Sequence, residues 1–224
     1  MRTSLELDRL AVGPPRAPAL FRLSLCVPAG KTAAVVGPSG FGGTTLARTI
    51  VGLLRPHAGR ILVREHASAP ERDITHLPPG ERPVGFVPAG GGLLPHLTVA
   101  GNILFGLRLR RRTFHIPEPA TDPTITALGL QPYLDHYPRL LTDSVVLRVA
   151  LARALSRAPE AVVVDGTAGA VGLGGLEEWW RRIPQHDRMT LLICTTTPEV
   201  AWWTDHVKQI PTRDPETAPG MDRQ

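Results

Sequence analysis

The N-terminal part of the chain alternates between apolar and polar residues with a period of two. In the segment FRLSLCV the residues of one face are all apolar, namely Phe21, Leu23, Leu25 and Val27. Alternation of this kind is typical of a strand with one buried face. Because LELDRL at residues 5–10 shows the same period, we expect the two segments to belong to an antiparallel β layer.

Later segments change from alternation to continuous apolar runs. Three of these runs are TAAVV, AVVV and LLIC, at residues 32–36, 161–164 and 191–194. Such a run predicts a strand that is buried on both faces, as in the centre of a parallel sheet. We therefore predict that these three segments are neighbouring strands of one sheet. The shorter segments RILV, RPVGFV and HVKQI predict further strands.

Apolar residues at helical spacing occur between the predicted strands. The segments are TTLARTIVGLL, VAGNILFGLRL, SVVLRVALARALSR and LEEWWRRI. Strands that alternate with helices favour an α/β fold whose core sheet is mainly parallel and flanked by helices. Residues 90–157 show helical patterns and no strand pattern, so we expect a helical lobe there. We expect residues 1–210 to form a single domain and residues 211–224, PTRDPETAPGMDRQ, to be a disordered tail.

The composition is that of a soluble globular protein. Of the 224 residues, 42% are hydrophobic and 20% are charged, and no apolar run approaches the length of a membrane-spanning helix. The N-terminus has charges too early for a signal peptide, so we expect a cytoplasmic protein. Cys26 and Cys194 both lie in apolar runs, which predicts buried, reduced thiols, and their spacing is not that of metal ligands.

The chain carries a net charge of +5, and its main basic cluster is RLRRRTFH at residues 108–115. Such a cluster could contact the phosphates of a nucleic acid or a lipid. No interleaved aromatic residues or recognised nucleic-acid motif accompany it. A solvated loop is therefore the favoured interpretation, and we expect no nucleic-acid partner.

The segment VVGPSGFGGTTLARTI, residues 35–50, is the strongest candidate for a binding site. Gly37, Gly42 and Thr44 match the phosphate-binding pattern G-x-x-x-x-G-K-[ST], but Gly43 occupies the lysine position. Backbone N–H groups of such a glycine-rich turn cradle phosphate at the start of a helix. The predicted binding residues are Gly37, Ser39, Gly40, Gly42, Gly43, Thr44 and Thr45. A tight strand-to-helix turn that binds nothing is the alternative.

Other patterns do not indicate a different chemistry. GPSGF is not a serine nucleophile elbow, because Phe41 stands where the second glycine belongs. The histidines form no ligand clusters at helical spacing. Two tryptophan pairs, at residues 179–180 and 202–203, are interpreted as packing residues of short helices.

The order of the segments resembles the ATP-binding subunit of ABC transporters. After the glycine loop follow LLPHLTVAGNILFGL, RVALARAL and VVVD, and THLPP and LPHLTV resemble importer ATPases of the sulfate, molybdate and sugar type. The resemblance extends from about Leu5 to Ile210. It implies a P-loop NTPase-like fold, ATP and Mg²⁺ as cofactors, and a location at the inner face of the membrane. It also implies a second ABC-type subunit and a transmembrane permease, which would dock near Leu93–Val99 through the apolar residues Leu93, Leu94, Leu97 and Val99.

The same resemblance assigns a metal site. Thr44 stands where the family's hydroxyl ligates Mg²⁺, and Asp165 stands where a carboxylate holds Mg²⁺ through water. Each residue also has a purely structural interpretation. A threonine in the first turn of a helix can satisfy a backbone N–H group, and an acid at a strand end can cap the next turn.

The family's catalytic positions are mostly changed. Gly43 replaces the lysine, Gly166 the catalytic glutamate, Ala89 the glutamine and Thr196 the histidine that contacts the γ-phosphate. The signature loop reads LTDSV at residues 141–145. There Thr142 could supply the signature hydroxyl, and Asp143 would repel the partner's nucleotide. The D-loop reads GAVG at residues 169–172, and no aromatic residue near Val12 can stack on adenine.

These changes predict a subunit with no catalytic residues. We expect an ATPase-deficient chain that keeps the scaffold of the family and docks on a membrane partner. One alternative is the ATP-hydrolysing or nucleotide-sensing half of an asymmetric pair, although such halves usually keep an intact signature loop. The other alternative is a basic nucleic-acid-binding module.

Overall fold

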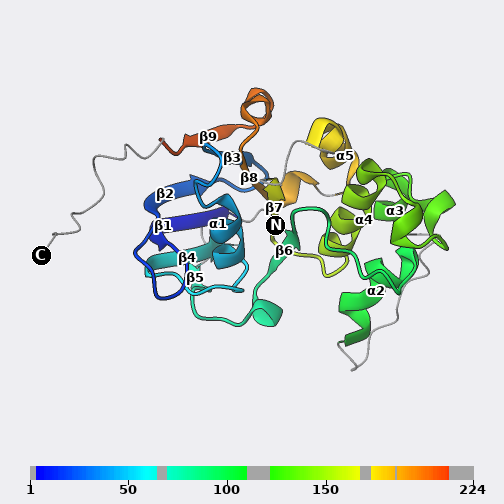
Figure 1. The fold of residues 1–224 in the computed structure, drawn as a ribbon, viewed down its shortest axis with the longest axis horizontal. Coiled ribbons are helices and arrows are strands. Elements are labelled where there is room, and N and C mark those ends of the chain that lie inside the picture. Colours follow the sequence, from blue (N-terminus) through cyan, green and yellow to red (C-terminus); the bar gives the residue numbers. More distant parts are fainter. Residues whose placement is uncertain (1–3, 65–69, 110–121, 167–172, 185, 212–224) are drawn as a thin grey trace, which may run out of the picture.

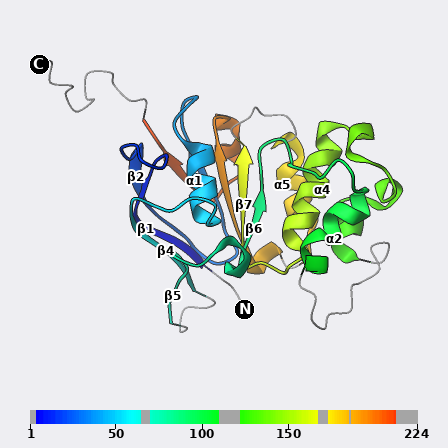
Figure 2. The same cartoon turned by 60° about the horizontal axis from the view of Figure 1, so that its bottom comes forward.

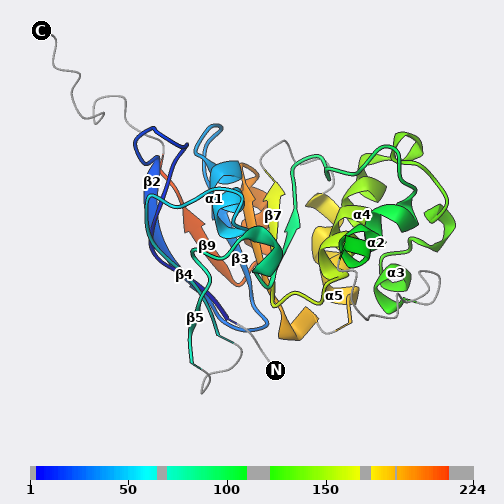
Figure 3. The ribbon, with the colours of Figure 1, turned by 90° about the horizontal axis from the view of Figure 1, so that it is seen from below.

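The computed structural model describes residues 4–64, 70–109, 122–166, 173–184 and 186–211. Two sheets and a group of helices are arranged side by side (Figure 1). An antiparallel sheet lies at one end, a parallel sheet lies in the middle and a helical lobe lies at the other end. Figures 2 and 3 show helix α1 between the two sheets. The predicted α/β fold with an antiparallel layer and a helical lobe is confirmed.

The antiparallel sheet has the strand order β2-β1-β4-β5. Its strands are β1 (Ser4–Val12), β2 (Phe21–Val27), β4 (Ala58–Arg64) and β5 (Arg72–Asp73). The predicted inner face of β2 is confirmed, because Leu23 and Val27 are buried and Phe21 and Leu25 pack against the same core. This layer covers one side of α1.

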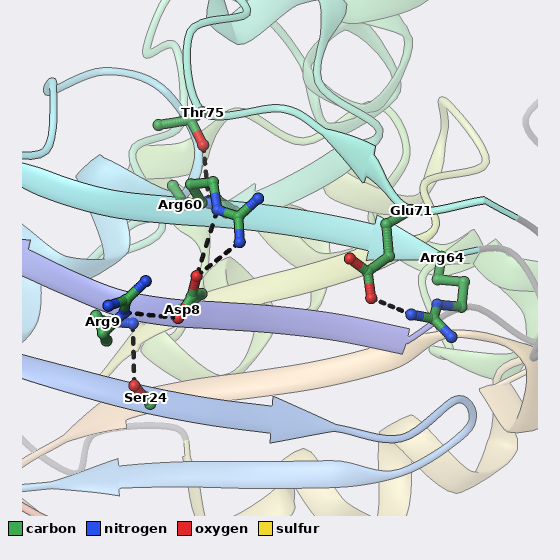
Figure 4. A network of polar contacts seen from close by, with 8 residues as sticks. Asp8, Arg9, Ser24, Arg60, Arg64, Glu71 and Thr75 are labelled. Atoms are coloured by element: carbon green, nitrogen blue, oxygen red, sulfur yellow. Dashed lines mark hydrogen bonds and ion pairs between the residues drawn. The ribbon is translucent and has the colours of Figure 1, made fainter.

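The opposite face of this sheet carries charged side chains (Figure 4). The Asp8 carboxylate accepts hydrogen bonds from Arg60 at 2.9 Å and from Arg9 at 3.2 Å. The hydrogen bond from Arg60 holds the pKa of Asp8 below its usual range. Arg64 forms an ion pair with Glu71 on the same face. Because these pairs are largely exposed to solvent, we expect them to contribute little to stability.

The parallel sheet has the strand order β6-β7-β8-β3-β9. Its strands are β3 (Thr32–Val36), β6 (Val84–Val87), β7 (Ala161–Gly166), β8 (Thr190–Thr195) and β9 (His206–Gln209). The three continuous apolar runs form β7, β8 and β3, which are direct neighbours, as the sequence predicts. Strands β7 and β8 are buried at every position.

The helices are α1 (Gly43–Ile50), α2 (Val99–Leu109), α3 (Pro123–Ala127), α4 (Asp143–Leu155) and α5 (Leu176–Arg182). Short 3₁₀ helices are η1 (Pro79–Glu81), η3 (Gln131–Tyr133), η4 (Pro138–Leu140), η5 (Leu173–Gly175), η6 (His186–Arg188) and η7 (Pro198–Trp202). The described residues between 90 and 157 contain helices and no strand, in agreement with the predicted lobe. None of the described helices is long and apolar enough to cross a membrane.

Helix α1 is shorter than its sequence pattern predicts. It ends at Ile50 because Gly52 adopts φ of +86°, a left-handed conformation that terminates helices. The buried Arg82 guanidinium donates to the carbonyl oxygens of Thr49 and Ile50 at 3.0 and 2.7 Å. A residue more than thirty positions away in sequence therefore caps the helix.

The prediction that all four tryptophans pack inside is wrong for Trp202. Trp180 is buried, and Trp179 and Trp203 pack against the core between the parallel sheet and the lobe. Trp202 is 85% exposed. In a 3₁₀ helix, residues three apart lie on one face. Val200 and Trp203 therefore share the inner face of η7, and Trp202 points outward.

The prediction of two buried thiols is wrong for Cys26. Cys194 lies in the buried strand β8, but Cys26 is exposed. The reason is the period of two in β2, which places Cys26 on the face opposite to Leu25 and Val27.

A thiol-labelling experiment is expected to modify one cysteine in the folded protein. Burial raises the pKa of the Cys194 thiol, and partial burial with the nearby Glu6 raises that of Cys26. Cys26 should therefore react slowly near neutral pH and faster as the pH rises, whereas Cys194 should react only after unfolding. Mass spectrometry of the alkylated protein would count the modified thiols. Two modified thiols under native conditions, or labelling that persists in Cys26→Ser, would contradict the structure.

Candidate functional site

The glycine loop connects β3 to α1 at the carboxyl end of the parallel sheet. Gly40 and Gly42 adopt φ of +80° and +101°, which residues with a side chain rarely adopt. The Phe41 N–H group donates to the Pro38 carbonyl at 3.0 Å, and the Gly37 N–H group donates to the Thr195 carbonyl at 3.2 Å. These two amides of the loop are thus engaged within the protein. Ser39 and Gly40 are exposed at its tip.

Helix α1 begins directly after this loop. Its N-cap is Gly42, which has no side chain to cap the first turn, and the first turn contains no acidic residue. The N-terminal amides of a helix favour anions. Gly43 is the first residue of the helix, and its φ angle is not positive. The backbone of the predicted phosphate cradle is therefore present, and the lysine charge is absent.

Phe41 is a feature that the motif pattern does not reveal. Its side chain is only 8% exposed. A Cβ atom on Gly37 would lie 2.5 Å from Cγ of Phe41, so the phenyl ring packs closely against the start of the loop. The rings of Phe41 and Phe21 are 6.2 Å apart. The loop thus also contributes to the core beneath the antiparallel sheet.

Thr44 and Asp165 lie close together, as the predicted metal site requires. The Thr44 hydroxyl donates to Oδ1 of Asp165 at 3.2 Å. Asp165 comes near the end of β7 and is 5% exposed. Mg²⁺ is usually held by one or two protein ligands together with waters and phosphates. The pair fits that role, and within the described residues no group of three or more His, Cys, Asp or Glu side chains forms a fuller metal site.

Gly166 follows Asp165, and two side chains pack close to it. A Cβ atom on Gly166 would lie 2.8 Å from Cδ1 of Leu173 and 3.3 Å from the Thr195 side chain. The Thr195 hydroxyl donates to the Gly166 carbonyl at 3.2 Å. Leu173 is buried and belongs to the core between the parallel sheet and the lobe. Any side chain at position 166 would have to displace these neighbours.

A cavity of about 260 Å³ lies between the end of β7 and the start of α4. It brings together three positions that differ from the family pattern, Ala89, Asp143 and Gly166, and it is also lined by Asp165. Two carboxylates and no basic side chain line this cavity. Asp143 therefore lines the same cavity as Asp165 within one chain. This arrangement disfavours a polyphosphate there.

A second cavity of about 550 Å³ reaches Thr44 and Asp165 from the side of α1 and β6. It includes Arg48, which is exposed and lies one turn further along α1 than Thr44. The Arg48 side chain therefore starts a full turn away from the N-terminal amides of α1. It does not stand in the position of the missing lysine.

Other predicted positions are scattered or lie outside the described residues. Val12 is fully buried and pairs with Phe21 in the antiparallel sheet. Thr142 is the N-cap of α4, and its side chain makes no capping hydrogen bond. The GAVG segment at 169–172 and most of the basic cluster, from residue 110 onward, lie outside the described residues, as does the predicted tail from residue 212.

The predicted docking segment is partly exposed. Leu93, Leu94 and Leu97 are half-buried. Val99 is fully buried at the start of α2, so its inclusion in a docking surface is wrong. Its position in the first turn of a core helix turns the side chain inward.

Comparison with known proteins gives the family. A family model described as ABC transporter matches residues 20–168. The chain belongs to the ABC transporter family.

Named relatives within this family are importer ATP-binding proteins. The chain is 36% identical to the sulfate/thiosulfate import ATP-binding protein CysA of Mycobacterium tuberculosis over 180 residues, which cover 79% of this chain and 50% of that protein. It is 33% identical to the putative 2-aminoethylphosphonate import ATP-binding protein PhnT of Salmonella typhi over 169 residues, covering 75% and 44%. The chain thus spans about half the length of these relatives. The predicted resemblance to ABC importer ATP-binding subunits is confirmed.

Solved ABC cassettes share the fold. The ADP conformation of the cassette MJ1267 matches with a TM-score of 0.73 and 21% identity, over 94% of this chain and 88% of that one. A dimeric, post-hydrolysis structure of the cassette MJ0796 matches with a TM-score of 0.70 and 20% identity, over 92% and 94%. The chain therefore has the cassette fold.

Proposed function

We propose that this chain is a degenerate ATP-binding subunit of an ABC importer, which retains the cassette as a scaffold and lacks ATPase activity. One observation carries this proposal: position 166, which follows Asp165 at the end of β7, is glycine, and a Cβ atom there would lie 2.8 Å from Cδ1 of Leu173. A general base at this position needs a side chain, and glycine has none.

The charges around the site support the same proposal. The γ-phosphate of ATP requires positive charge from a lysine and from Mg²⁺. Gly43 provides none, and the adjacent cavity carries Asp143 and Asp165. Ala89 and Thr196 cannot replace a glutamine and a histidine as contacts to the phosphate and the attacking water.

Some affinity for phosphate is nevertheless part of the proposal. The proposed binding residues are Gly37, Ser39, Gly40, Gly42, Gly43, Thr44 and Thr45, with Thr44 and Asp165 for Mg²⁺. The uncapped first turn of α1 favours an anion, and the Thr44–Asp165 pair can hold a hydrated Mg²⁺ ion. When bound, ATP with Mg²⁺ would supply the polyphosphate that this site holds, without further chemistry.

The proposed partners follow from the importer relatives. A transmembrane permease would dock on the surface formed by Leu93, Leu94 and Leu97, and a second ABC-type subunit would complete the assembly. In such an assembly the chain would lie at the cytoplasmic face of the membrane, with residues 1–210 as one domain. That nucleic acid is not a partner stays a prediction, because most of the basic cluster lies outside the described residues.

A second candidate is the nucleotide-sensing half of an asymmetric pair. The observation that favours it is the intact contact between Thr44 and Asp165, at 3.2 Å. Such a half would bind Mg·ATP tightly without hydrolysing it.

Calorimetric titration separates the two candidates. For the degenerate scaffold, Mg²⁺ complexes of ATP, GTP and pyrophosphate should bind weakly and with similar affinity. The reason is that backbone amides hold phosphate, and Val12 is buried and has no ring that could stack on the base. Low-micromolar binding of ATP, with much weaker binding of GTP and pyrophosphate, would favour the sensing half and contradict the scaffold proposal.

A further inference from the structure

The loop between β6 and α2, residues 88–98, has an unusual backbone. Gly90, Gly91 and Gly92 follow one another with φ of +66°, +73° and +53°. Three consecutive glycines in the left-handed region form a segment that would be flexible without further support. Its neighbours supply that support.

Arg153 of α4 holds the first half of this loop. Its guanidinium donates to the Gly92 carbonyl at 2.7 Å and to the Gly91 carbonyl at 2.8 Å. Arg153 is partly buried, and this burial lowers the pKa of its guanidinium. Hydrogen bonds from a charged donor are among the strongest in proteins.

The loop also lies directly against α4. A Cβ atom on Gly91 would lie 2.5 Å from Cγ1 of Val146 and 3.4 Å from its carbonyl oxygen. Only glycine permits this approach. The Gly91 N–H group in turn donates to the Pro88 carbonyl at 2.9 Å, which closes a turn at the start of the loop.

Asn102 of α2 holds the second half. Its side chain is fully buried. Oδ1 accepts from the Leu94 N–H group at 2.7 Å, and Nδ2 donates to the carbonyls of Leu94, Leu97 and Thr98 at 3.0–3.2 Å. The turn that presents Leu93, Leu94 and Leu97 is thus built around one amide side chain.

We propose that Arg153 and Asn102 are positioning residues that hold the 88–98 loop in one conformation. Both residues belong to helices of the lobe, Arg153 to α4 and Asn102 to α2. The lobe therefore fixes the backbone of this loop, which also lines the cavity beside Asp165. The idea that a partner docks on this surface rests on the proposed function. The fixed conformation of the loop is independent of the proposed function.

Hydrogen exchange measured by mass spectrometry tests this inference on peptides that cover residues 88–98. In Arg153→Gln, exchange of the loop is expected to be about tenfold faster or more, because two hydrogen bonds from a charged donor are lost. Peptides from β7 and β8 should be unchanged. Arg157→Gln is the matched control, because Arg157 donates to the Gly80 carbonyl at 2.7 Å on a different loop.

Arg153→Lys provides a second variant if the glutamine variant folds poorly. Lysine keeps a positively charged donor but lacks the planar guanidinium that reaches two carbonyls. In Arg153→Lys, hydrogen exchange of the 88–98 loop should therefore be faster than in the unchanged protein and slower than in Arg153→Gln. Unchanged loop exchange in a folded Arg153 variant would overturn the inference, as would faster exchange spread equally over the whole protein. ATP turnover by the natural chain would contradict the proposed function and leave this result standing.

Discussion

Purified protein supplied with Mg·ATP is expected to release phosphate no faster than the background without protein. Gly43 gives no positive charge to the γ-phosphate, and Gly166 cannot act as a general base. A positioned base alone typically contributes ~10²–10⁴-fold in rate. The chain also has Thr196 in place of the histidine that contacts the γ-phosphate. The loss of the base, the lysine and this histidine together should abolish ATP turnover. A coupled phosphate-release assay over a long incubation would measure it.

Two variants make this measurement decisive. Asp165→Asn should leave any residual signal unchanged if that signal comes from a contaminating ATPase. Gly166→Glu alone should not rescue activity, because the new side chain must displace Leu173, whose Cδ1 lies 2.8 Å from the Cβ position, and because the γ-phosphate still lacks its clamp. A Mg²⁺-dependent turnover on the order of 1 s⁻¹, typical of slow enzymes, would show that the proposal is wrong.

Gly43→Lys is expected to tighten the binding of ATP, GTP and pyrophosphate together. Gly43 is a buried residue at the first position of α1, and its φ is not positive, so its backbone conformation is one that lysine also adopts. A lysine at this position restores a charge beside the uncapped amides. A hydrogen bond to a charged group contributes about 1.5–3 kcal/mol, which corresponds to roughly tenfold or more in each affinity.

Gly43→Gln is the matched control for this variant. Glutamine brings a similar gain in helix propensity over glycine, about 1 kcal/mol, without the charge. Calorimetric titration of the three ligands should therefore show the gain with lysine and little change with glutamine. A gain confined to ATP would reveal an adenine site that the buried Val12 does not provide. Equal gains in affinity for Gly43→Lys and Gly43→Gln would mean that the stability of the first helical turn, and not the charge, limits binding.

Local sequence patterns were sufficient for the architecture. The continuous apolar runs predicted β3, β7 and β8 as neighbours, because a strand buried on both faces must be apolar at every position. The period of two in β2 placed Leu23 and Val27 in the core. The family resemblance assigned Thr44 and Asp165 to one metal site, and the structure brings them together. Asp165 lies near the end of β7 and Thr44 follows the loop after β3, and both strands belong to the same parallel sheet.

Burial at the ends of elements was less predictable. The same alternation that buried Leu23 and Val27 left Cys26 outside, and the three-residue repeat of η7 left Trp202 exposed. Helix α1 stopped at Ile50, where the distant Arg82 caps its last carbonyls. The first two outcomes follow from the period of each element, whereas the end of α1 depends on a residue from another part of the chain.

The sequence alone determined that positions 43 and 166 offer no side-chain chemistry, because both residues are glycine. Only the tertiary structure decided which side chains pack around Gly166 and the neighbouring loops. Leu173 fills the space beside Gly166, Phe41 packs under the glycine loop, and Arg153 holds the carbonyls of Gly91 and Gly92. Two of these contacts join different elements of the fold. Their geometry depends on how sheets and helices pack together, which a one-dimensional pattern does not record.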